Sequence, residues 1–240
     1  MKQVKRVLAT SVCVGLMALA GHAAAGPIVA GGSYNVENKA GTVFTPSTSP
    51  GDSNGLYTNL TIKVGMTQTT VSAGMFVLDY QEAGTASAWQ QFLTFCLSPD
   101  VSLTPFDNPY TAFNLSSPPY SGSADLIAEF WGRYRSQVTS DVTAAAFQVG
   151  LWELAYNGEK NLSTGSFQLV TAGAVFDKAQ DWLSSLNGSG ARATGLLVLV
   201  DKAAYPNTQD LLTQQVPEPG TLALLGLGLL GLALTRRRAQ

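Results

Sequence analysis

Two uncharged apolar segments, each next to a cluster of basic residues, lie at opposite ends of the 240-residue chain and confine its globular part to the middle. At the N-terminus, two lysines and an arginine within the first six residues precede an apolar run that ends in three alanines at 23–25. This order is typical of a secretory signal peptide. We therefore expect residues 1–25 to be a signal peptide and the mature chain to begin near Gly26.

Signal cleavage changes which residues are available for chemistry. The single histidine, His22, and one of the two cysteines, Cys13, lie in the predicted signal peptide. The mature chain then has no histidine and only Cys96 as a thiol. This excludes Ser-His-Asp and Cys-His catalytic sites, histidine-ligated zinc and an internal disulfide. We predict no metal, no cofactor and no enzymatic turnover.

The C-terminus combines a Pro-Glu-Pro segment, a glycine-rich apolar stretch at 221–235 and an arginine cluster, in that order. The residues of the two polar parts are Val216, Pro217, Glu218, Pro219 and Gly220, and then Arg236, Arg237 and Arg238. At ~1.5 Å per residue, a helix over the apolar stretch would span roughly 22 Å, short of a usual bilayer core. Basic residues favour the cytoplasmic side, so the domain before the helix is expected outside the membrane.

This segment, 216–240, resembles the PEP-CTERM sorting signal of Gram-negative bacteria. The resemblance implies that an exosortase, a membrane transpeptidase-like protease, recognises and removes the tail. It also implies an inner-membrane anchor before processing, a cell-surface or extracellular location afterwards, and a setting of exopolysaccharide and biofilm formation.

The charge of the central part limits the partners of the exported domain. Residues 26–215 contain eight basic and fifteen acidic residues, which gives a net charge of −7. A negative surface repels nucleic acid and anionic lipid headgroups. It is compatible with divalent cations or with partners that carry amines.

Hydrophobic periodicity predicts an α+β domain over residues 26–202, followed by a polar linker at 203–215. Strands are expected at 58–64, 67–72, 74–80, 89–97 and 195–200. Helices are expected after an N-cap at Ser123, after an N-cap at Asp141 and over about 169–186. The segment 104–122 is expected to be a loop because it is rich in proline, serine and asparagine. We expect a β-sandwich or barrel-like sheet with an insertion of about three helices.

Two residues differ from their apolar surroundings. Cys96 lies in a strand that is apolar on both faces, and Gln148 is the sole polar side chain between 144 and 151. A buried carboxamide costs several kcal/mol unless it is hydrogen-bonded, so Gln148 requires a partner or a chemical change. Attack of the Cys96 sulfur on this carboxamide would expel ammonia and leave an internal thioester.

The segments around Cys96 and Gln148 resemble the two signatures of thioester domains in bacterial surface proteins. The matching residues are Phe95 and Cys96 in the first motif and Phe147, Gln148, Leu151, Trp152 and Glu153 in and next to the second. Gly150 stands where alanine is commoner, a change expected to be minor, and Asp100 stands for the acidic residue that often follows the cysteine. The resemblance implies a thioester that traps an amine on a partner as an isopeptide bond.

Other interpretations of the same residues stay open. A lone buried cysteine is often an inert apolar residue, a buried glutamine can bond a strand carbonyl, and aromatic residues at helical spacing are often core. The alternative function is therefore a structural or exopolysaccharide-associated matrix protein without a reactive thioester.

Overall fold

The structure is a computed structural model that describes residues 27–37, 55–103, 109–201 and 208–215. The predicted signal peptide and the C-terminal sorting segment lie outside the described residues. Within the described part, no helix is long and apolar enough to cross a membrane.

Six antiparallel strands close into a barrel. In the order of their pairing they are β1 (Ser33–Glu37), β5 (Tyr110–Asn114), β7 (Leu196–Asp201), β8 (Leu211–Gln214), β4 (Gln90–Cys96) and β3 (Thr67–Glu82). The barrel closes because β1 pairs with β5 on one side and with β3 on the other. Closure leaves these six strands without the open sheet edge that would otherwise invite aggregation.

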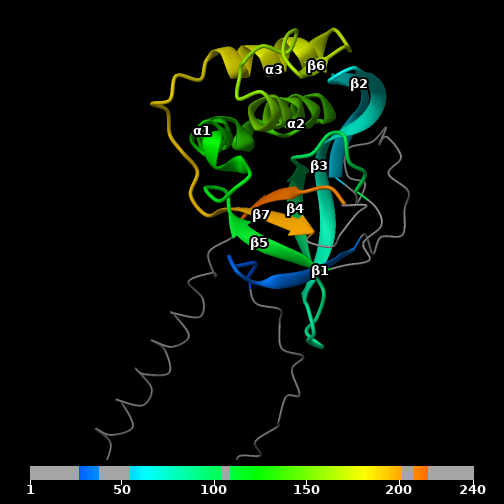
Figure 1. Cartoon of the computed structure of the whole chain (residues 1–240), viewed down its shortest axis with the longest axis vertical. Helices are drawn as coiled ribbons and strands as arrows, with labels where there is room; N and C mark the ends of the chain where they lie inside the picture. The colour runs from blue at the N-terminus through cyan, green and yellow to red at the C-terminus, as the bar shows by residue number, and fades with distance from the viewer. Residues whose placement is uncertain (1–26, 38–54, 104–108, 202–207, 216–240) are drawn as a thin grey trace, which may run out of the picture.

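The long strand β3 belongs to two parts of the sheet. Its second half pairs with β4 in the barrel, whereas its first half pairs with β2 (Gly55–Val64). The short strand β6 (Phe167–Leu169) adds to the far side of β2. β2 and the first half of β3 therefore rise beyond the barrel toward the helices, as Figure 1 shows.

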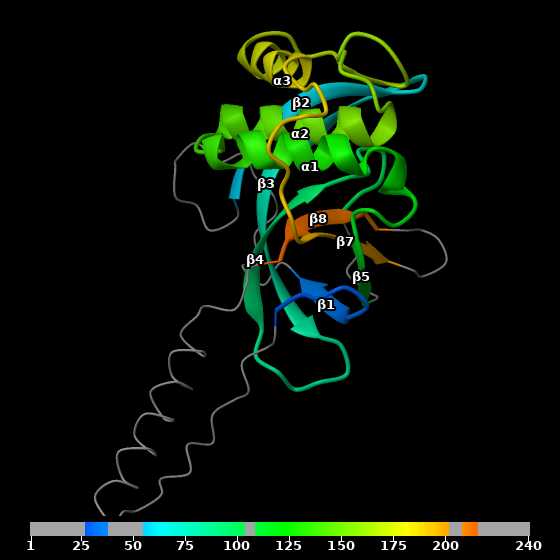
Figure 2. The same ribbon diagram turned by 90° about the vertical axis from the view of Figure 1, so that its left-hand side faces the viewer.

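Three helices gather at one end of the barrel: α1 (Ala124–Tyr134), α2 (Asp141–Tyr156) and α3 (Ala174–Ser184). The two views in Figures 1 and 2 show α2 between α3 and the strands. Every residue of α2 from 144 to 154 is buried. A helix in this middle position meets apolar neighbours on all sides, which explains why its sequence is apolar nearly all round. Two short 3₁₀ turns, η1 (Tyr120–Gly122) and η2 (Arg135–Gln137), flank α1.

The predicted fold class, an α+β domain with a barrel-like sheet and three inserted helices, is confirmed in these elements. The start of α2 differs by one residue from the prediction. Ser140, not Asp141, is the N-cap, and its hydroxyl accepts a hydrogen bond from the backbone N–H of Thr143. The Thr143 hydroxyl in turn accepts from the backbone N–H of Ser140, so the two residues form a reciprocal capping box.

The prediction of two strands at 67–72 and 74–80 was wrong, because both belong to the single strand β3. Gly74 does not interrupt the strand. It lies where β2 approaches closely, and a Cβ atom there would sit 2.1 Å from the carbonyl oxygen of Leu56. The glycine therefore allows two strands to pack tightly rather than marking a turn.

Three other segments also depart from their predictions. The predicted loop 104–122 contains β5 and η1, and the expected helix over 169–186 begins only at Ala174, after β6. The predicted linker 203–215 contains β8, which lies between β7 and β4 in the barrel. Each of these strands has three to five residues, too few to produce a recognisable period, and their non-local partners determine them.

Candidate functional site

Cys96 is the last residue of β4 and lies where that strand loses one of its neighbours. The pairing of β3 with β4 ends at Phe76 and Thr94. On the opposite side, β4 continues to pair with β8. Because alternate residues of a strand direct their backbone groups to opposite neighbours, the N–H and C=O of Cys96 point to the side that β3 has left.

The side chain of Gln148 on α2 takes the place of the missing strand. Its Oε1 accepts a hydrogen bond from the backbone N–H of Cys96 at 2.8 Å, and its Nε2 donates to the backbone C=O of the same residue at 2.6 Å. The fold thus brings together two residues that are 52 positions apart in the chain. The carboxamide contacts the backbone of Cys96, and both residues are buried.

Aromatic side chains from α1, α2 and β4 pack together at the residues that precede this pair in the chain and at α1. Phe147 packs against Phe95 and against Phe130, with 4.8 Å between ring centroids in each case. Trp131 contacts both Phe95 and Phe147, and Leu151 is fully buried. Burial in this apolar region raises the pKa of the Cys96 thiol, so the thiol is protonated at neutral pH.

Gly150, which stands where the thioester pattern more often has alanine, is required by the packing of α2 against α1. A Cβ atom at this position would lie 2.3 Å from Cζ of Phe130, whose ring is fully buried. The large ring of Phe130 occupies the space that an alanine methyl group would need.

Glu153 is buried but faces a loop rather than Cys96. Its carboxylate accepts hydrogen bonds from Nδ2 of Asn157 at 2.8 Å and from the backbone N–H of Asn161 at 3.3 Å. Burial raises the pKa of Glu153 to about 7, although these two hydrogen bonds act in the opposite direction. Its contacts indicate that Glu153 holds the loop between α2 and β6.

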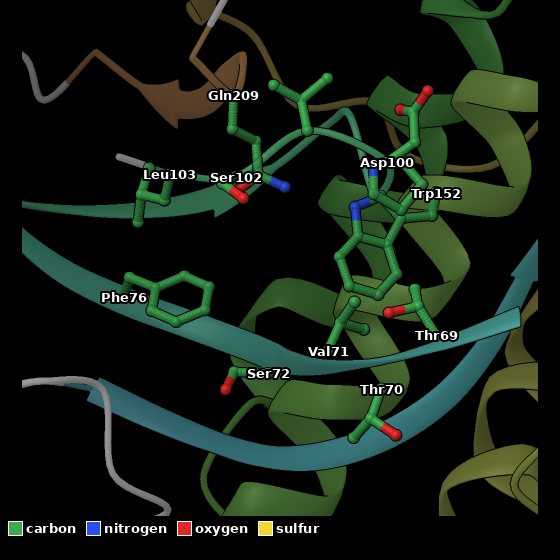
Figure 3. A pocket seen from close by; sticks show the side chains of 12 residues that line it. Thr69, Thr70, Val71, Ser72, Phe76, Asp100, Ser102, Leu103, Trp152 and Gln209 are labelled. Carbon is green, nitrogen blue, oxygen red and sulfur yellow. The ribbon is translucent and has the colours of Figure 1, made fainter. Parts of the chain in front are cut away.

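Trp152 lies one helical turn after Gln148 and lines a cavity of about 340 Å³. The side chain is 1% exposed and packs against Phe167 at 6.0 Å between ring centroids. Among the described residues, its Nε1 has no hydrogen-bond partner. Figure 3 shows the indole between β3 and the loop that follows β4, with its nitrogen-bearing edge turned to the open space.

Asp100 lies beside Trp152 at this cavity, in the loop that leaves β4. Its Oδ1 accepts a hydrogen bond from the hydroxyl of Tyr156, the last residue of α2. The loop after Cys96 is therefore tied to the helix that carries Gln148 and Trp152.

Sequence reasoning did not identify the other residues of the cavity wall. The polar ones are Thr69, Thr70, Ser72, Ser102 and Gln209. The only sequence signal was the run of polar residues at 67–70. Such a run is equally typical of a solvent-exposed strand and of a strand that lines a binding cavity. Among the described residues, no group of three or more His, Cys, Asp and Glu side chains is arranged to hold a metal ion.

Comparison with known protein families identifies the C-terminal segment. Residues 215–238 match the PEP-CTERM protein-sorting motif. The chain carries a PEP-CTERM sorting signal. The match covers the Pro-Glu-Pro segment and the three arginines. It indicates an exported protein that an exosortase processes. No curated protein and no solved structure matches the chain.

Proposed function

We propose that this protein is an exosortase-processed surface protein that attaches covalently to amine-bearing partners through an internal thioester between Cys96 and Gln148. The observation that supports the proposal is the direct contact of the Gln148 carboxamide with the backbone of Cys96, deep in an apolar region. Within the described residues, Cys96 is the free cysteine.

Formation of the thioester balances without any co-reactant. The Cys96 sulfur attacks the carboxamide carbon of Gln148, the C–N bond breaks, and the thiol proton leaves on the departing ammonia. A new S–C bond then joins the two side chains. Reaction with a partner reverses the roles: an amine attacks the same carbon, a secondary amide forms on Gln148, and the Cys96 thiol is released.

The surroundings of the pair are suited to storing such a bond. Both residues of the pair are buried, and burial keeps out water, which would otherwise hydrolyse the thioester. Forming the thioester has a structural cost, however, because loss of the Nε2 group removes its hydrogen bond to the Cys96 carbonyl.

Intact-mass spectrometry of the exported protein tests this proposal. The mature chain should weigh one ammonia less than its sequence, and methylamine should add to Gln148 and free the Cys96 thiol for alkylation. Cys96→Ala should give the full sequence mass and no methylamine adduct. A full mass for the freshly purified wild-type protein, with an alkylatable Cys96, would contradict the thioester.

A second candidate is a structural matrix protein without a reactive bond. Two observations favour it: the hydrogen bonds of Gln148 are already satisfied by Cys96, and burial raises the pKa of the thiol. In this case Gln148 serves only to complete β4 where β3 leaves it. The same mass measurement separates the two candidates.

The proposed route to the surface depends on the sorting signal at 215–238. We expect cleavage near the Pro-Glu-Pro segment at 217–219. Replacing Glu218 or deleting the three arginines at 236–238 should leave unprocessed protein in the membrane fraction. Normal processing of both variants would contradict this route.

A further inference from the structure

The cavity beside Trp152 has an unsatisfied hydrogen-bond donor on its wall. Trp152 is 1% exposed, and its Nε1 has no partner among the described residues. An indole nitrogen can only donate, and a buried donor without an acceptor costs about 1–3 kcal/mol. This cost is recovered when a molecule in the cavity supplies an acceptor oxygen.

The rest of the wall defines which molecule would fit. Hydroxyl and carboxamide groups, which can both donate and accept, come from Thr69 on β3 and from Ser102 and Gln209 on the facing side. Phe76, Val71, Pro99 and Leu103 add apolar surface between them. Alternating hydroxyl partners and apolar patches match the alternating O–H groups and C–H faces of a sugar ring.

The charge of the cavity excludes one class of ligand. Among the residues that line it, Asp100 is charged and none is basic. A carboxylate at the rim accepts hydrogen bonds from hydroxyl groups but repels phosphates and uronic acids. The volume of about 340 Å³ lies at the lower end of the ~300–1,000 Å³ range of small-molecule pockets, which favours a ligand of a few rings at most.

We propose that the cavity between β3, α2 and the loop after β4 binds an uncharged sugar unit, with Trp152 Nε1 donating to one of its oxygens. This site does not depend on the thioester. It uses the face of α2 one turn beyond Gln148, and none of its lining residues is Cys96 or Gln148.

Titration calorimetry of the exported protein tests the site. The probes are glucose, galactose, mannose and N-acetylglucosamine, with glucuronate as the charged comparison. We expect at least one neutral sugar to bind and glucuronate to bind at least ~10-fold more weakly than that sugar, the factor that corresponds to one lost hydrogen bond. Failure of all four neutral sugars, or glucuronate binding as tightly as they do, would overturn the proposal.

Two variants with the same chemical change locate the site. Trp152→Phe removes the unpaired N–H and should lower the affinity on the order of 10-fold. Trp131→Phe removes an indole that donates to Gln214 at 3.0 Å and does not line the cavity, so its affinity should stay that of the wild type. Equal affinities in the two variants would overturn the assignment.

Exposed wall residues provide a test that does not depend on the stability of a tryptophan variant. Thr69→Val and Ser102→Ala remove hydroxyl groups from opposite walls, at exposed positions where folding tolerates the change. Each should weaken binding about 3-fold or more if the hydroxyls contact the sugar. Cys96→Ala should bind as the wild type does, so loss of the thioester and loss of sugar binding are separate results.

Discussion

Gln148 and Trp152 lie one turn apart on the same buried helix, but the polar group of the first is hydrogen-bonded and that of the second is not. The carboxamide of Gln148 makes two hydrogen bonds to the backbone of Cys96, so both its oxygen and its nitrogen have partners inside the domain. The indole N–H of Trp152 has no partner among the described residues and borders a cavity with polar walls.

The difference shows how one helix serves both the fold and a binding surface. A polar group that completes a strand end is needed for stability, because its loss leaves the backbone unsatisfied. A polar group that borders a cavity without a partner in the domain does not hold the fold together and is available to a ligand. Substitution should therefore destabilise the domain much more at Gln148 than at Trp152.

The largest effect is expected at Gln148. Gln148→Leu leaves the N–H and C=O of Cys96 buried without partners, and each group costs about 1–3 kcal/mol. The free energy of unfolding should fall by about 2–5 kcal/mol in urea denaturation. Cys96→Ala is the control: it keeps both backbone groups and should cost only about 1 kcal/mol for the lost sulfur. Equal losses in the two variants would contradict the strand-completing role of Gln148.

A pH dependence is expected from Glu153, the next residue after Trp152. Burial raises its pKa from 4.5 to about 7, so the protonated form is favoured in the folded state. The contribution to stability is full below about pH 4 and is lost as the pH rises through 7, a change of about 3 kcal/mol. Unfolding measured from pH 4 to pH 8 should show this decline, and Glu153→Gln should flatten it.

The matched comparison for this pH effect is Glu129 on α1, which is also buried. Burial raises the pKa of Glu129, but hydrogen bonds to its carboxylate lower the pKa by more, so the net direction is downward. The donors are the backbone N–H of Asn187, the Arg133 guanidinium and the N–H groups of Gly188 and Gly190. The ionised carboxylate of Glu129 should therefore stabilise the domain at neutral pH, and this stabilisation should be lost as the pH falls. In Glu129→Gln, the free energy of unfolding should no longer show this decrease in acid. The same pH profile in both glutamine variants would show that hydrogen bonding does not separate the two carboxylates.

A smaller effect is expected at Gly150, which lies between Gln148 and Trp152. Gly150→Ala places a Cβ atom 2.3 Å from Cζ of Phe130 and forces α2 away from α1. Overpacking typically costs 1–3 kcal/mol, and the better helix propensity of alanine offsets about 1 kcal/mol of it. The melting temperature should fall, and Phe130→Leu in the same chain should restore part of the loss. No recovery in the double variant would argue against this contact as the cause.

The smallest effect is expected for the unpaired indole. Trp152→Phe loses ring volume but also removes an unsatisfied donor, so stability should change by no more than about 1 kcal/mol. Trp131→Phe loses similar volume and a hydrogen bond to Gln214, and should be about 1–2 kcal/mol less stable than Trp152→Phe. The reverse order in thermal melts would show that the Trp152 N–H is satisfied in solution.

Local pattern in the sequence was sufficient to single out two residues of the candidate site. An apolar helix with one glutamine and an apolar strand with one cysteine pointed to Cys96 and Gln148, and the fold brings these residues into contact. The pattern did not show that the carboxamide bonds the backbone of Cys96, because that depends on where β3 leaves β4. The cavity wall was also hidden, since Thr70, Ser102 and Gln209 come from three distant segments.

By itself, the sequence determined the C-terminal sorting signal and the buried helix. The sorting signal at 215–238 is a local order of residues, and α2 is apolar over enough turns to predict both its form and its burial. Only the tertiary structure decided the closure of the barrel. β1, β5 and β8 are too short to have a period of their own, and backbone hydrogen bonds to strands distant in the chain determine their positions. Such pairings depend on contacts that no local stretch of sequence contains.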